Sequence, residues 1–170
     1  FHQAMRCGAE IFHELKTVLK EHGYHPGVGD EGGYACALPS HESAFENIIT
    51  AIERSGYTPG KDVVLGIDTA ASELYRDGQY HLSLEGLALS NIAFIEKYKE
   101  WHRRYPLYSI EDGLAEDDWD GHKLLTDALG KSVQLVGDDI FVTNKHRFLR
   151  GIKEGIGNAI LHLHRAVQAA

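Results

Sequence analysis

The sequence of 170 residues predicts an α/β protein with a parallel sheet, forming part of a (β/α) barrel. Short apolar runs of about 4–8 residues alternate with segments of helical periodicity, a pattern typical of βα units. Three of these runs, 63–67, 107–110 and 133–137, are each followed by an acidic residue. We count about five candidates for parallel strands and one hairpin. The predicted sheet is therefore a large part of a barrel, and this chain does not close it.

The acids that follow the three runs are Asp68, Glu111 and Asp138. In parallel α/β folds, ligands bind at the carboxyl ends of the strands, so we expect these side chains to converge. Ionised carboxylates that lie close together repel one another unless a cation neutralises them. Because all-oxygen ligands favour a hard ion, the pattern predicts Mg²⁺. The alternative is that each acid caps the helix after its strand, and the sequence leaves that interpretation open.

The first third of the chain reads as two helices around a glycine-rich acidic segment. Apolar residues at helical spacing predict a helix that ends near Gly23. In the segment 28–33, glycines flank Asp30 and Glu31, which can bring a carboxylate close to a ligand or form an acidic surface turn. Ser40 is the expected cap of a second helix, which ends at Gly56.

The remaining elements are indicated by turn and cap residues. Asp77-Gly78 predicts a two-residue hairpin, and Ser90 the start of a helix that runs toward Pro106. After the strand at 107–110, an acidic loop leads to a helix over 119–129, with Asp117 or Asp118 as its cap. Thr143 is the expected cap of the last helix, and 159–163 is the last strand-like run.

Composition excludes several classes of function. A net charge of −8 argues against nucleic acid as a partner, since binding phosphates needs a basic face. No apolar stretch reaches the roughly 18–20 residues of a membrane span, and the start of the chain has no signal-peptide pattern. Cys7 and Cys36 have no metal-binding spacing, so we expect both to be packing residues. Two cysteines of this kind fit a reducing, cytoplasmic compartment.

Four segments, 28–35, 68–73, 109–119 and 136–144, resemble the enolase family, the phosphopyruvate hydratases of glycolysis. They follow the order of that family at its approximate spacings, and the resemblance runs from Ala4 to Leu161. It implies a partial TIM-type barrel of the enolase kind, not closed by this chain. On this basis we expect residues 1–163 to belong to the C-terminal barrel domain of an enolase, and residues 164–170 to form a tail unlike the family.

The resemblance also implies a chemistry. Asp68, Glu111 and Asp138 match the magnesium ligands of the family, with Glu111 and Asp138 also at the substrate, and Glu31 matches its catalytic glutamate. In the family, a lysine removes a proton from 2-phosphoglycerate, two Mg²⁺ ions stabilise the enediolate, and the glutamate helps the 3-hydroxyl leave as water, giving phosphoenolpyruvate. Full-length members are homo-oligomeric, cytoplasmic lyases, and some bind other proteins on cell surfaces.

The end of the chain departs from the family. Leu163 stands at the position of the base lysine, and leucine cannot accept a proton. His162 and His164 are alternative bases, or weak ligands of a transition metal, but on a strand both point away from the face that position 163 uses. The family's N-terminal domain and its other barrel strands are absent from this sequence. We therefore expect an inactive fragment whose unpaired strand edges favour association.

Two further interpretations remain. The chain can be a non-enzymatic remnant or a binding fragment of an enolase. It can also belong to another lyase or racemase of the enolase superfamily, although the motif 29–33 is that of enolase proper.

Overall fold

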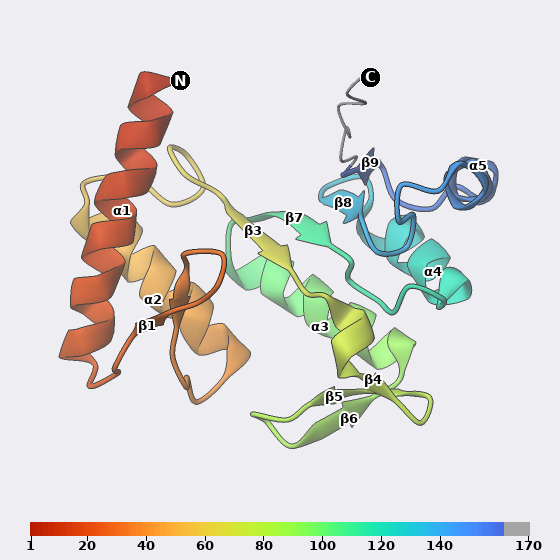
Figure 1. The fold of residues 1–170 in the computed structure, drawn as a ribbon, viewed down its shortest axis with the longest axis horizontal. Helices are drawn as coiled ribbons and strands as arrows, with labels where there is room; N and C mark the ends of the chain where they lie inside the picture. Colours follow the sequence, from red (N-terminus) through yellow and green to blue (C-terminus); the bar gives the residue numbers. More distant parts are fainter. Residues whose placement is uncertain (162–170) are drawn as a thin grey trace, which may run out of the picture. The chain divides into compact units, whose positions relative to one another are not determined.

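The computed structural model describes residues 1–161, which form two compact units, with the division between Leu65 and Gly66 (Figure 1). Strand β3 begins at the division, and all of its residues after Leu65 belong to the second unit.

The first unit consists of two helices and a short hairpin. Helices α1 (His2–Glu21) and α2 (His41–Arg54) lie side by side, with Val18 and Ile52 fully buried (Figure 1). The predicted cap of α2 is confirmed, since the Ser40 Oγ accepts from the Ser43 N–H at 3.1 Å. Strands β1 (Gly27–Val28) and β2 (Tyr34–Ala35) pair antiparallel and enclose the acidic turn 29–33.

The second unit is built on a four-stranded sheet in the order β3-β7-β8-β9. β7 pairs parallel with β8, and β8 with β9. Among the described residues the sheet is open, which confirms a partial, unclosed TIM-type barrel. This sheet has four strands where about five were expected, and the segment before Asp30 pairs antiparallel in the hairpin of the first unit. The strands are β3 (Leu65–Asp68), β7 (Leu107–Glu111), β8 (Gln134–Gly137) and β9 (Ala159–Ile160).

One α-helix lies between each two consecutive strands of this sheet, as βα units require. They are α3 (Asn91–Arg104), α4 (Trp119–Leu129) and α5 (Lys145–Glu154). The predicted caps Ser90 and Asp118 are confirmed, because the Ser90 Oγ accepts from Ala93 N and the Asp118 Oδ1 from Gly121 N. The predicted cap of α5 was wrong: Asn144, not Thr143, caps it, and the Asn144 Oδ1 accepts from the N–H groups of His146 and Arg147.

A small antiparallel sheet follows β3 and the 3₁₀ turn η1 (Ala71–Leu74). Its strands are β4 (Tyr75–Arg76), β5 (Gln79–Leu82) and β6 (Leu87–Leu89). Asp77 and Gly78 both have positive φ, 51° and 80°, so the predicted hairpin turn is confirmed. The third strand was not predicted, since only three residues pair there.

An aromatic stack fixes the end of β7. The rings of Tyr80 and Phe94 lie 5.2 Å apart, and those of Phe94 and Tyr98 lie 4.5 Å apart. The buried Tyr98 hydroxyl donates to the Gly113 carbonyl oxygen at 2.8 Å. The backbone two residues beyond Glu111 is therefore held by the core, which limits how far the end of the strand can move.

A second cluster, Trp119, Ile140, Phe141 and Ile156, holds the loop after β8. The Phe141 ring is wedged between two glycines. An added Cβ would lie 2.5 Å from this ring at Gly137, and also 2.5 Å from it at Gly151. Because Phe141 is 2% exposed, its ring has little room to retreat from either side.

This packing predicts opposite effects for the same substitution in two helices. Gly151→Ala in α5 should destabilise the protein by about 1–3 kcal/mol, since overpacking outweighs the gain in helix propensity. Gly8→Ala in α1, where a Cβ would have nothing within 4 Å, should stabilise it by about 0.5–1 kcal/mol. Urea unfolding followed by circular dichroism measures both, and equal gains would show that Phe141 moves aside easily.

Candidate metal centre

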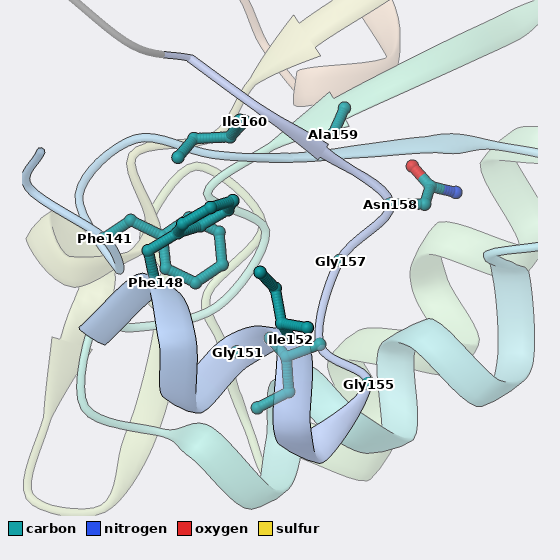
Figure 2. A pocket seen from close by; sticks show the side chains of 10 residues that line it. Phe141, Phe148, Gly151, Ile152, Gly155, Gly157, Asn158, Ala159 and Ile160 are labelled. Carbon is teal, nitrogen blue, oxygen red and sulfur yellow. The ribbon is translucent and has the colours of Figure 1, made fainter. Parts of the chain in front are cut away.

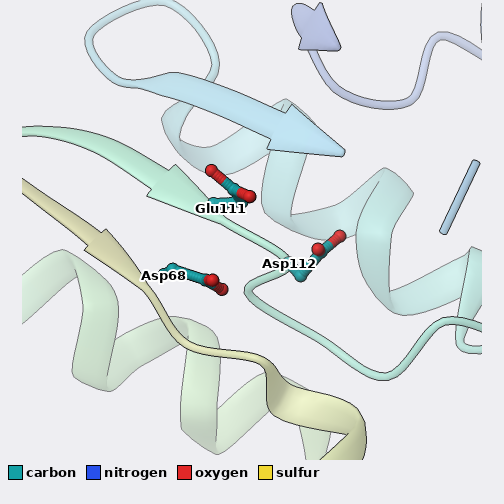
Figure 3. Close-up of side chains that lie close together, drawn as sticks. All are labelled: Asp68, Glu111 and Asp112. Atoms are coloured by element: carbon teal, nitrogen blue, oxygen red, sulfur yellow. The ribbon is translucent and has the colours of Figure 1, made fainter. Parts of the chain in front are cut away.

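Two strand ends bring carboxylates together in the second unit. Asp68 is the last residue of β3 and Glu111 the last of β7, and the Thr69 N–H donates to the Glu111 carbonyl oxygen at 3.0 Å. One carboxylate oxygen from each of Asp68, Glu111 and Asp112 lies within 4.8 Å of the other two (Figure 3). These three side chains offer oxygen ligands only.

The negative charges of these carboxylates repel one another. Burial, followed by the charge of Asp68, raises the pKa of Glu111 above its ordinary value. Asp112, Asp138 and Asp139 act in the same direction. A hard divalent cation would relieve this repulsion, and carboxylate oxygens are the ligands it prefers. The donor set and its crowding therefore fit Mg²⁺.

Asp138, the third predicted ligand, follows β8 directly but is not in the group within 4.8 Å. β8 is the parallel neighbour of β7, with Glu111 in register with Val136. The charge of Asp138 contributes to the raised pKa of Glu111, so the two carboxylates interact electrostatically. The structure thus brings Asp68 and Glu111 together and places Asp138 at the same end of the sheet.

Asp112 is not among the residues that the sequence predicted for this centre. It is 4% exposed, and its Oδ1 and Oδ2 accept from the N–H groups of Asp138 at 3.1 Å and Asp139 at 2.9 Å. Burial raises the pKa of Asp112 above its ordinary value, although the two hydrogen bonds act in the opposite direction. The only sequence signal was its place after Glu111, since its partners are 26 and 27 residues away.

The alternative that each acid caps the following helix does not account for all three. Asp118 rather than Glu111 caps α4, and Asn144 rather than Asp138 caps α5. Asp68 does bond locally, since its Oδ1 accepts from the Ala70 N–H at 3.0 Å in the turn before η1. This bond closes a local turn and is not a helix cap, since η1 has no side-chain cap, so helix capping accounts for none of the three acids.

The acids of the loop after β7 have different roles. The Asp118 carboxylate accepts from the Tyr80 hydroxyl at 2.8 Å, besides capping α4. Asp117 is exposed and pairs with Arg147 at 3.1 Å. These two acids stabilise the loop that follows the candidate metal centre, and neither belongs to the group of ligand oxygens.

The other predicted catalytic residues belong to the first unit or to the end of the chain. Glu31 is exposed in the hairpin turn of the first unit, where the Gly29 N–H donates to the Gly33 carbonyl oxygen at 2.8 Å. Its role together with the carboxylates of the second unit stays a prediction. Leu163, His162 and His164 lie outside the described residues, so the predictions about the base also stay predictions.

An apolar pocket of about 290 Å³ lies between α5 and β9 (Figure 2). Its walls include Phe141, Phe148, Ile152 and Ile160, and no lining residue is charged. The amide of Asn158, its polar lining side chain, already bonds three backbone groups. The pocket therefore has no charged side chain to hold a phosphorylated substrate, and the cluster of Asp68, Glu111 and Asp112 remains the candidate site.

No helix within residues 1–161 is both long and apolar enough to cross a membrane. Residues 1–167 match the family model described as "Enolase, C-terminal TIM barrel domain". The match spans both units of the structure and includes every carboxylate of the candidate centre.

Proposed function

Because the chain belongs to the family of the enolase C-terminal TIM barrel domain, we propose that it is a phosphopyruvate hydratase barrel segment. The proposed reaction is the reversible dehydration of 2-phosphoglycerate to phosphoenolpyruvate in glycolysis. The observation that carries the proposal is the meeting of the Asp68 and Glu111 oxygens at adjacent strand ends. The motif 29–33 supports enolase itself over other lyases or racemases of the superfamily.

Asp68, Glu111 and Asp138 are the proposed magnesium ligands. When bound, Mg²⁺ supplies the positive charge that a substrate carboxylate needs as the neighbouring carbon loses its proton. The residues of the chain contribute the geometry. The end of β7 is fixed by the aromatic core, and the backbone bond from Thr69 to Glu111 holds the ends of β3 and β7 together.

Glu31 is the proposed acid for the leaving hydroxyl. A hydroxide is a poor leaving group unless a positioned acid protonates it, and an exposed carboxyl on a glycine-rich turn has the freedom to approach a substrate. The base is the missing part. Leu163 stands where the family has its lysine, so we propose that the chain as written binds metal and does not turn over substrate.

A non-enzymatic binding function is the second candidate, and the same Leu163 favours it. Cytoplasmic location is proposed on the two cysteines, Cys7 and Cys36, which are free thiols. Homo-oligomerisation is proposed on family resemblance.

A magnesium titration tests the metal centre. Millimolar Mg²⁺ should raise the melting temperature of the chain, and saturation at about 100 times Kd corresponds to about 2.7 kcal/mol of stabilisation. Asp138→Ala should remove the gain, because it removes a proposed ligand. Asp120→Asn, on an exposed acid of α4, should keep it. A gain that survives Asp138→Ala, or no gain at all, would contradict the proposal.

A further inference from the structure

Asp112 connects the ends of three strands. Its N–H donates to the Val136 carbonyl oxygen at 3.1 Å, and its own carbonyl oxygen accepts from the Ala71 N–H at 3.1 Å. Its carboxylate then accepts from the first two N–H groups after β8, those of Asp138 and Asp139. One residue thus links the turn after β3, the end of β7 and the loop after β8.

We propose that Asp112 is a positioning residue of the metal centre, which fixes Asp138 relative to Asp68 and Glu111 and does not itself bind the ion. This inference rests on the proposed function. Both carboxylate oxygens of Asp112 already accept a hydrogen bond, and the residue is 4% exposed. Hydrogen bonds to a carboxylate are charge-assisted, so they hold the loop after β8 more firmly than neutral ones.

The backbone at Asp112 is consistent with this role. Its φ is 42°, in the left-handed region that residues with a Cβ seldom adopt, although aspartate tolerates it better than most. This conformation turns the chain directly after Glu111, so that the two successive side chains point to different neighbours. Glu111 faces Asp68, while the carboxylate of Asp112 reaches the loop after β8.

The closeness of Asp112 to Asp68 and Glu111 raises the rival possibility that Asp112 is a ligand. The two roles differ in how Asp112 and Asp138 combine. A positioning residue acts through Asp138, so its removal adds nothing once the Asp138 carboxylate is gone. A second ligand acts independently, so the two losses multiply.

A double-mutant cycle on the binding of Mn²⁺, followed by the electron paramagnetic resonance of the free ion, separates them. Mn²⁺ is the probe because it takes the same oxygen ligands as Mg²⁺. Asp112→Asn should weaken binding about 10–100-fold, the usual effect of removing a partner behind a ligand. In the Asp138→Asn background, the same change should alter binding less than about twofold. Multiplying losses, or an Asp112→Asn variant with unchanged affinity, would overturn the inference.

A second readout needs no metal. In the metal-free protein, the amides of Asp138 and Asp139 should exchange hydrogen faster in Asp112→Asn than in the unaltered chain, and at the unaltered rate in Glu111→Gln. Unchanged exchange in Asp112→Asn would contradict the positioning role. Asp77→Asn is the matched control, since Asp77 is also an aspartate at positive φ, 51°, but lies in an exposed hairpin turn.

If Asp112→Asn does not fold, as judged by circular dichroism, Asp112→Gly removes the carboxylate while accommodating the positive φ. The same losses of affinity and amide protection are expected for it. If the unaltered chain binds Mn²⁺ and the Asp112 variants bind it with the same affinity, the inference is refuted, while the proposed metal centre is not. A lack of Mn²⁺ binding in the unaltered chain would refute both.

Discussion

Glu111→Gln should stabilise the metal-free protein and abolish its stabilisation by magnesium. Burial is the largest cause of the raised pKa of Glu111, and the negative charges of neighbouring aspartates raise it further. These are Asp68, Asp112, Asp138 and Asp139. Replacing Glu111 with a neutral isostere removes this repulsion, for a gain of roughly 0.5 kcal/mol, the scale of one partly exposed charge pair. The same change removes a proposed ligand. At saturating Mg²⁺ the variant should therefore be about 2 kcal/mol less stable than the unaltered chain.

The order of stability of the two proteins should reverse during a magnesium titration of their urea unfolding curves. Glu116→Gln is the matched control, because Glu116 is an exposed glutamate in the loop after β7 and outside the ligand group. It should leave the response to magnesium intact. A Glu111→Gln variant that is less stable without metal, or that keeps the magnesium gain, would show that the carboxylates do not act as one centre.

The chain as written should form no phosphoenolpyruvate from 2-phosphoglycerate above background. A positioned general base typically contributes about 10²–10⁴-fold to a proton transfer, and Leu163 offers no lone pair at that position. A coupled assay in the presence of Mg²⁺ measures the rate. Turnover in this assay that disappears in Glu31→Gln would contradict the expectation and would point to another base. The same result would favour catalysis over the non-enzymatic binding function.

The strand ends could be predicted from the sequence because their signals are local. An apolar run followed by an acid identifies the end of a parallel strand, and the ends of adjacent strands meet at one edge of the sheet. Asp68 and Glu111 do meet there, and Asp138 follows β8 on the adjacent strand. Caps with a small polar residue at the start of a clear helical pattern, such as Ser40 and Ser90, were also predictable.

Features that depend on distant partners were not predictable. Asp112 read as one acid among several, and its role is visible only in its bonds to Asp138 and Asp139, far along the chain. Thr143 and Asn144 both have the chemistry of a cap. The choice between them depends on backbone geometry: Thr143 has a φ of 56°, while Asn144 is extended and its Oδ1 reaches the first turn of α5.

We propose that the carboxylates at the ends of β3, β7 and β8 hold a single divalent ion. Anomalous diffraction from crystals soaked in Mn²⁺ tests it most directly. We expect a peak at roughly 2.0–2.6 Å from oxygens of Asp68, Glu111 and Asp138, with Asp112 still bonded to the loop after β8. A peak coordinated by Asp112 in place of Asp138, or no peak at this edge of the sheet, would contradict it.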